Sequence, residues 1–159
     1  MNVVFEDAGT EHLDTILEMM RMYYYDERMT YIPEKARPAL EELITHQERG
    51  RVWMIFFDHE CVGYFIITYA FTVEFHGRNA VLDEMYIKEE YRDRGIGRHA
   101  LEFMERFLKS EGIDVFRLEV EELNLRAARF FRENGFDQHE RHLMTKYLQD
   151  HGERAKNFI

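Results

Sequence analysis

The sequence YIKEEYRDRGIGRHALEFMERF, from Tyr86 to Phe107, decides the fold of this chain. It begins at the end of a strand pattern, crosses a charged segment and reaches Gly95-Ile96-Gly97 just before an amphipathic helix pattern. A helix N-terminus presents unpaired N–H groups and a partial positive charge. Glycines there tolerate unusual dihedral angles and remove side chains, so a phosphate can approach the main chain. A glycine turn beside a solvated charged face is the plainer alternative.

The length and composition predict a single domain over residues 1–159, with a tail of about 149–159 that frays. The chain is 45% hydrophobic and 14% aromatic, which is typical of globular proteins. The first ten residues lack a signal-peptide pattern, and no apolar run is long enough to span a bilayer. The single cysteine, Cys61, excludes an internal disulfide and favours a reducing compartment. We therefore expect a cytoplasmic protein with no membrane partner.

The net charge of −10 repels phosphate backbones, so we expect no nucleic-acid partner. It attracts small cations such as amines, although an acidic surface also serves solubility alone. Within this acidic chain, Arg92, Arg94 and Arg98 gather around the glycine turn. This local excess of positive charge favours an anionic ligand at the turn. We expect no metal site.

The spacing of apolar residues predicts a βααβββαβαβ(β) order, a mixed sheet with helices on its faces. The expected strands cover residues 2–7, 51–57, 61–73, 80–87 and 114–120, with two short strands within 136–148. The expected helices cover residues 10–27, 36–49, 97–107 and 124–134.

Two nucleotide-binding motifs can be compared with the glycine turn. The chain has no G-x-x-x-x-G-K-[ST] pattern, which excludes a nucleotide P-loop. GIGRHA does fit the G-x-G-x-x-A pattern of dinucleotide sites, with Glu119 near the distance of a ribose-binding acid. That motif places its first glycine directly after the strand, whereas KEEYRDR separates Ile87 from Gly95 here. A nicotinamide enzyme is therefore disfavoured.

The motifs of a different protein family fit the sequence better, because two of them occur here in the expected order with a predicted strand between them. LDEMYIKEEYRDRGIGRHALEFM resembles the acetyl-CoA-binding motif of the GNAT superfamily of N-acetyltransferases, with Arg92 to Gly97 matching [QR]-x-x-G-x-[GA]. NLRAARFFRENGF is similar to the family's N-x-x-A-x-x-[LF]-Y-x-x-x-G-F helix, and the resemblance covers roughly residues 1–148. GYFIITYAFTVEFHGRNAVLDEMYI further resembles the branch that acetylates polyamines and diamines.

The resemblance implies an α/β (α+β) fold: a mixed, mostly antiparallel central sheet of six to seven strands flanked by about four helices. It also implies acetyl-CoA as co-substrate. The pyrophosphate would lie on N–H groups of the glycine turn, and the pantetheine arm would pair with the strand backbone. The cofactor-binding residues carried over are Met85, Tyr86, Ile87, Arg92, Asp93, Arg94, Gly95, Ile96, Gly97, Arg98, His99, Asn124 and Phe131. Asn124 is equally well suited to cap the following helix.

The implied chemistry is direct attack of an amine on the thioester in a ternary complex. The amine must be neutral, and an alkylamine with a pKa near that of lysine is only ~0.1% neutral around pH 7.4. This deficit is about 4 kcal/mol, which a positioned general base can largely recover. Relatives often keep an acid where Asp83 and Glu84 stand. Strand alternation turns the two to opposite faces, so we expect one to face the acceptor and favour Glu84. Both can instead be solvated charges.

Phe131 departs from the family pattern, because relatives carry a tyrosine there that protonates the leaving thiolate. Water, or another tyrosine such as Tyr64, Tyr86 or Tyr147, would then supply the proton. Because of this departure, a non-catalytic module that binds acyl-CoA is an alternative function for the chain.

The first two helices, the segment that joins them and the hairpin TVEFHGRN (residues 72–79) are expected to bind the acceptor. Tyr24, Tyr25 and Glu27 are the predicted substrate-binding residues, as part of an aromatic wall with nearby acids. The sequence therefore predicts an N-acetyltransferase that acts on a primary amine of a small cationic molecule. A protein N-acetyltransferase is the other enzymatic reading, and similar proteins commonly form homodimers.

Overall fold

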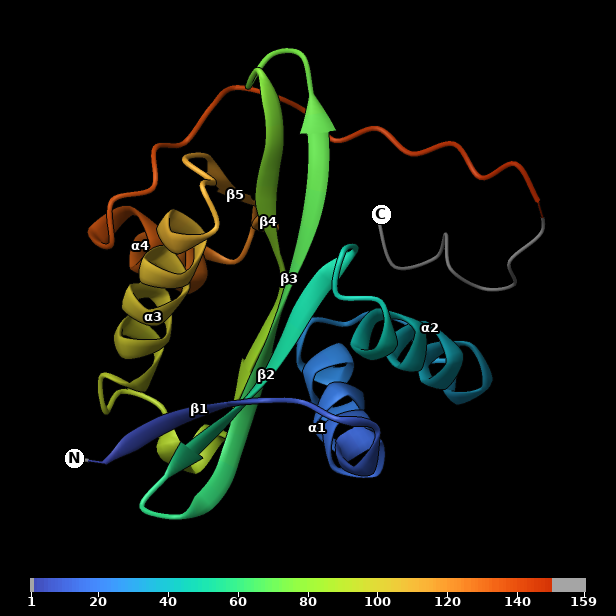
Figure 1. Ribbon diagram of the computed structural model, residues 1–159, viewed down its shortest axis with the longest axis vertical. Helices are drawn as coiled ribbons and strands as arrows, with labels where there is room; N and C mark the ends of the chain where they lie inside the picture. Colours follow the sequence, from blue (N-terminus) through green and yellow to red (C-terminus); the bar gives the residue numbers. More distant parts are fainter. Residues whose placement is uncertain (1, 150–159) are drawn as a thin grey trace.

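A computed structural model describes residues 2–149 of the chain. Its centre is a five-stranded sheet in the order β1-β2-β3-β4-β5, antiparallel throughout except for the parallel pair β4–β5 (Figure 1). The strands are β1 (Val3–Asp7), β2 (Gly50–Phe57), β3 (Glu60–Thr72), β4 (Gly77–Ile87) and β5 (Phe116–Leu118). The α-helices are α1 (Leu13–Asp26), α2 (Pro33–Thr45), α3 (Ile96–Ser110) and α4 (Leu125–Glu133). The predicted α+β class is confirmed.

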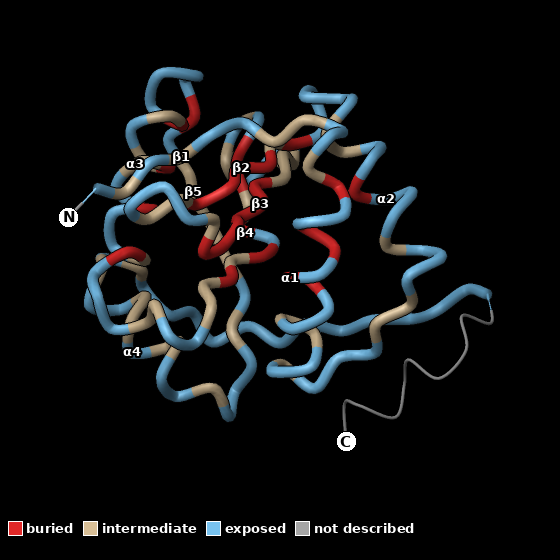
Figure 2. Tube along the Cα trace, turned by 90° about the horizontal axis from the view of Figure 1, so that it is seen from below, coloured by how far each residue is buried: buried red, intermediate tan, exposed pale blue. Residues whose placement is uncertain are grey.

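The helices form two layers, with α1 and α2 on one face of the sheet and α3 and α4 on the other (Figure 1). Each layer closes its own core. One core packs Trp53, Phe65 and Leu101 between the sheet and α3, and the other packs Ile16 and Tyr64 between the sheet and α1. The buried residues accordingly lie along the sheet in the middle of the molecule (Figure 2). The sheet is thus covered on both sides where its strands are longest.

Helix α3 forms because its apolar residues recur at helical spacing. Ile96, Ala100, Leu101, Met104 and Leu108 are all buried, which places them on one stripe against the sheet. The remaining positions are largely charged and exposed. Across residues 2–149, no helix has the length and apolar character needed to cross a membrane.

Helix α2 differs from its predicted bounds at both ends. It begins at Pro33 rather than residue 36, because a proline at the first helical position has its φ angle already set for a helix. It ends at Thr45, and Gly50 opens β2 instead of closing the helix.

The prediction of six to seven strands is wrong for the described part of the chain, which has five. Residues 136–149 form no strand and run away from α4 past the end of the β3–β4 hairpin (Figure 1). An ion pair between Arg141 and Glu74 holds this segment near the hairpin turn, with 2.5 Å between nitrogen and oxygen. Leu143 and Met144, whose side chains are typical of strands, are exposed in this segment.

Candidate active site

The carboxylate of Glu84 is the only buried acidic side chain among residues 2–149, and it is 8% exposed. Two hydroxyl groups donate hydrogen bonds to it: Tyr64 to Oε1 at 2.8 Å and Tyr24 to Oε2 at 3.2 Å. The pKa of Glu84 is raised to about 7. Burial is the largest cause, the Asp83 charge adds to the rise, and the hydrogen bonds from Tyr64 and Tyr24 partly oppose it. A carboxylate with this pKa exchanges protons in the neutral range, as a general base must.

A β-bulge at Asp83 turns Glu84 toward the α1–α2 layer. Glu84 pairs with Ile66 of β3, but Leu82 pairs with the adjacent Ile67, which leaves Asp83 without a partner in β3. The expectation that Asp83 and Glu84 face opposite sides of the sheet is therefore wrong. Both line one cavity, because the extra residue interrupts strand alternation. Burial raises the pKa of Asp83 as well, with a smaller contribution from Glu119.

The cavity in front of Glu84 has a volume of about 360 Å³, within the range of small-molecule sites. Helices α1 and α2 and strands β3 and β4 form its walls. Its apolar lining consists of Met20, Ala36, Ala39, Leu40, Leu43 and Ile66, and its polar lining of Tyr24, Glu42, Arg49, Asp83 and Glu84.

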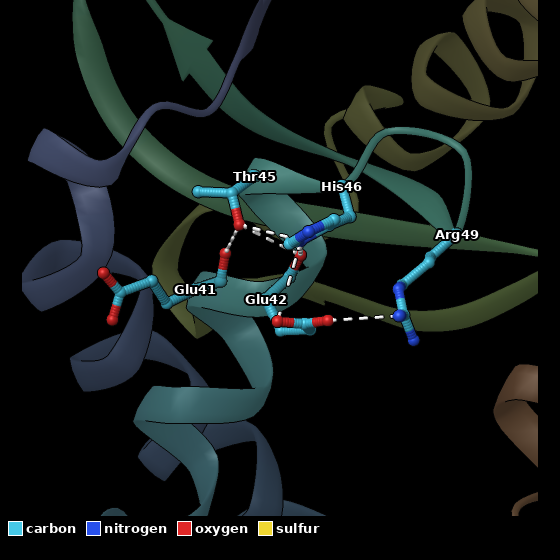
Figure 3. A network of polar contacts seen from close by, with 5 residues as sticks. All are labelled: Glu41, Glu42, Thr45, His46 and Arg49. Atoms are coloured by element: carbon cyan, nitrogen blue, oxygen red, sulfur yellow. Dashed lines mark hydrogen bonds and ion pairs between the residues drawn. The ribbon is translucent and has the colours of Figure 1, made fainter.

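Glu42 and Arg49 belong to a polar network at the end of α2 (Figure 3). The Glu42 carboxylate lies 3.3 Å from Arg49 Nη2 and 3.6 Å from His46 Nδ1. Thr45 donates to the main-chain carbonyl of Glu41 at 2.8 Å, which fixes the last turn of the helix. The network thus holds one cation and one anion at the edge of the cavity.

We expect Tyr64→Phe to raise the pKa of Glu84 above about 7. Tyr64 is fully buried, its own pKa is raised well above the usual range by burial, and its hydroxyl therefore remains a donor that favours the Glu84 carboxylate. Without this bond, the acidic limb of the kcat/KM profile should move to higher pH while the plateau at high pH is largely kept. A pH–rate profile measures this shift. An unmoved acidic limb would separate the titration of Glu84 from catalysis.

The glycine turn forms an anion-accepting helix end. Gly95 caps α3 in the left-handed conformation, with φ 79°, and no side chain caps the helix. Within residues 2–149, the N–H groups of Ile96, Gly97 and Arg98 therefore have no partner. A Cβ atom at Gly97 would lie 3.1 Å from Met85 and from Phe130, so this glycine also permits close packing of the helix.

Ion pairs with the two neighbouring helices hold the glycine turn. Arg92 pairs with Asp26 of α1 at 2.9 Å and donates to the Ile87 carbonyl at 2.8 Å. Asp93 accepts from Arg126 of α4 at 2.9 and 3.0 Å. Arg92 of the basic cluster is thus committed to positioning the turn, and the main-chain N–H groups of the turn remain for an anion.

The edge of β4 is open beside this turn. Pairing between β4 and β5 covers only Ala80 to Leu82, and the described chain supplies no further strand beside Asp83–Ile87 on that side. An extended ligand arm can add to such an edge through main-chain hydrogen bonds. The open edge and the uncapped end of α3 lie on consecutive segments of the chain, so their donors and acceptors fit the phosphate and the amide-containing arm of acetyl-CoA.

Asn124 caps α4, as its residue type suggests. Its Oδ1 accepts from the Ala127 N–H at 3.1 Å, and its Nδ2 donates to Glu27 at 3.4 Å. Burial raises the pKa of Glu27, and the Asn124 hydrogen bond opposes this. Phe131 packs its ring against Phe130 and Phe136, with ring centroids 5.1 and 5.6 Å apart.

The predicted acceptor residues separate in the structure. Tyr24 lines the cavity and touches Glu84, whereas Tyr25 is 78% exposed and Glu27 faces Asn124 instead. The sequence interpretation missed Glu42 and Arg49 as cavity residues and the bond from Tyr64 to Glu84. No local sequence pattern marks them, because β3 and the end of α2 meet β4 only through the fold.

Residues 2–149 bring no three His, Cys, Asp or Glu side chains into an arrangement that could hold a metal ion.

The comparisons with known proteins agree with this geometry. The acetyltransferase (GNAT) family pattern matches residues 13–136. No curated protein sequence matches the chain. A possible acetyltransferase from Clostridium difficile 630 has a TM-score of 0.79 at 18% identity, covering 94% of this chain and 100% of that one.

Two further solved structures share the fold at 15% identity each. A predicted acetyltransferase from Clostridium acetobutylicum, solved with acetyl-CoA, has a TM-score of 0.77 and coverage of 94% and 99% of the two chains. An aminoglycoside acetyltransferase from an uncultured soil metagenomic sample, in complex with sisomicin, has a TM-score of 0.76 and coverage of 93% and 97%. Because the family pattern spans most of the chain, this protein belongs to the acetyltransferase (GNAT) family.

Proposed function

We propose that this protein transfers the acetyl group of acetyl-CoA to a primary amine of a small molecule, and that this amino group is cationic in solution. The observation that carries the proposal is the buried Glu84, with a pKa near neutrality, at the wall of a cavity large enough for such a molecule. The solved acetyltransferases with acetyl-CoA and with sisomicin support the same cofactor and an amine-bearing acceptor.

Acetyl-CoA would supply an acetyl thioester as the electrophile. The N–H groups of Ile96, Gly97 and Arg98 would bind its pyrophosphate, and the open edge of β4 would orient its arm. This edge belongs to the strand that carries Glu84, so the arm would lead to the neighbourhood of the base.

Glu84 would accept the proton of the acceptor ammonium, and Tyr24 and Tyr64 would hold the carboxylate in place. Asp83 lines the same cavity and adds negative charge that attracts the cationic acceptor. Both carboxylates would thus favour amine binding, while the better buried one performs the proton transfer.

Calorimetric titration with acetyl-CoA and NADH, followed by a thiol-release assay with a panel of amines, tests this function. We expect acetyl-CoA to bind, NADH not to bind, and free CoA to appear only when a primary amine is present. Binding of NADH without binding of acetyl-CoA would contradict the proposal at its first step.

A non-catalytic acyl-CoA-binding module is the second candidate, and Phe131 favours it. A phenyl ring has no proton to give to a leaving thiolate, and Tyr64 is already committed to Glu84. This candidate predicts acetyl-CoA binding without thiol release for any amine, peptide or aminoglycoside.

A further inference from the structure

The cavity in front of Glu84 has a distinct chemical group at each end. Asp83 and Glu84 lie at the β4 end, and Glu42 and Arg49 lie at the end of α2. The main-chain carbonyl of Arg49 accepts from Tyr69 N–H at 2.9 Å. Tyr69 is three residues along β3 from Ile66, the partner of Glu84. Three residues of strand cover about 10 Å, which is the span of a short extended molecule.

An apolar wall joins the two ends. The lining between them consists of alanine, leucine, methionine and isoleucine side chains from α1, α2 and β3, with Tyr24 as the aromatic member. Such a surface favours an alkyl or aryl body over a polyhydroxylated one, because hydroxyl groups would find few partners there. The middle of the ligand is therefore expected to be apolar.

At the α2 end, the guanidinium of Arg49 has N–H groups without a partner among the described residues, and its one ion pair is with Glu42. One oxygen of Glu42 pairs with Arg49 at 3.3 Å, and the other lies 3.6 Å from His46 Nδ1, a contact that is an ion pair only when His46 is protonated. In the described chain Arg49 uses only Nη2, in that one ion pair, so Nε and Nη1 have no partner. Its side chain is 60% exposed, which leaves these N–H groups accessible to a ligand. A guanidinium with free donors suits a carboxylate or phosphate, whereas a second ammonium group would meet its positive charge.

Resting on the proposed function, we infer that the acceptor is a primary amine with an apolar body and an anionic group at its far end, which Arg49 binds. The amine would lie at Glu84 and the anion at Arg49, with the α2 wall covering the body between them. This assigns Arg49 a role in specificity rather than in the chemical step. It also disfavours diamines and polyamines, since their second cation would face Arg49.

Three acceptors of matched length test this inference: 6-aminohexanoate, hexylamine and 1,6-diaminohexane. Their dissociation constants are measured calorimetrically in the presence of CoA, which avoids turnover, and their kcat/KM values by thiol release with acetyl-CoA. For the wild type we expect 6-aminohexanoate to bind about tenfold more tightly than hexylamine, as a charge-assisted hydrogen bond provides, and 1,6-diaminohexane to bind more weakly than either.

Arg49→Gln should remove the advantage of 6-aminohexanoate and leave hexylamine binding unchanged. Glu42→Gln should increase that advantage, because Arg49 loses its internal partner. The control is Arg37→Gln, since Arg37 lies on α2, pairs with Asp14 and is not part of the cavity lining. This control should change none of the three affinities.

Preferential binding of 1,6-diaminohexane by the wild type, or an equal loss for all three ligands in Arg49→Gln, would overturn the inference. Failure of all three to bind would overturn it as well. Turnover without any end-group preference would refute the role of Arg49 and leave the proposed function standing. Selective binding of 6-aminohexanoate without thiol release would support the role of Arg49 in binding and refute the proposed acetyl transfer.

Discussion

Glu84→Gln is expected to lower kcat/KM by about 10²–10⁴-fold near neutral pH, the range that a general base contributes. The amide keeps the shape of the side chain but cannot accept the proton of the acceptor ammonium. The defect should shrink as the pH approaches the pKa of the amine, because solvent then supplies neutral amine. In the wild type, kcat/KM should rise with pH through about 7, where Glu84 loses its proton. Thiol release over a pH series measures both effects.

Asp83→Asn is the matched control, since Asp83 lines the same cavity from the adjacent position. It removes one negative charge and should therefore lower the pKa of Glu84 and weaken acceptor binding, with a smaller loss of turnover. A larger loss of turnover in Asp83→Asn than in Glu84→Gln would reverse the assignment of the base. A Glu84→Gln defect that is constant across pH would point to folding or binding instead.

Arg98→Glu is expected to weaken acetyl-CoA binding by about tenfold or more, because it brings negative charge to the end of α3 where the pyrophosphate would lie. The Arg98 side chain is 71% exposed, and among residues 2–149 it pairs only with Glu102, so the change disturbs no core contact. A glutamate in the first turn of α3 interacts favourably with the helix dipole and stabilises the helix. Its repulsion from Glu102 destabilises the helix by a similar amount. The Tm without ligand should therefore change little. Calorimetric titration with acetyl-CoA at low and high salt measures the loss.

Arg106→Glu provides the comparison, since the exposed Arg106 lies eight residues further along α3, about 12 Å from Arg98. The same charge change at that distance should be largely screened at physiological salt. Equal weakening by the two variants would indicate a general effect of net charge and would argue against a phosphate site at the glycine turn.

The fold was predictable where local patterns carry it. The glycine turn, the helical stripe of α3 and the Asn124 cap all follow from residue type and spacing, and the structure has each of them. The strand count was not predictable in the same way. Residues 136–148 have strand-like composition, but a strand also needs a partner edge, and the sequence does not state which edge is available.

The candidate site was predictable only in part. Glu84 and Tyr24 follow from the family resemblance and from the composition of the first helix. The hydrogen bond from Tyr64 and the cavity position of Arg49 depend on how β3 lies between β2 and β4. Such contacts join residues far apart in sequence, and no periodicity within one element reveals them.

The bulge at Asp83 makes the number of residues in β4 as important as their identity. Before the bulge, Ala80 and Leu82 pack toward α3, and after it Met85 and Ile87 do so. The residues of β4 that face α3 therefore change from even-numbered to odd-numbered at the bulge. Without the bulge, Glu84 would pair with Phe65 instead of Ile66 and, two residues after Leu82, would face the same helical layer as Leu82. The side of the sheet on which this acid lies is thus set by one extra residue in β4, and not by the identity of Glu84 alone.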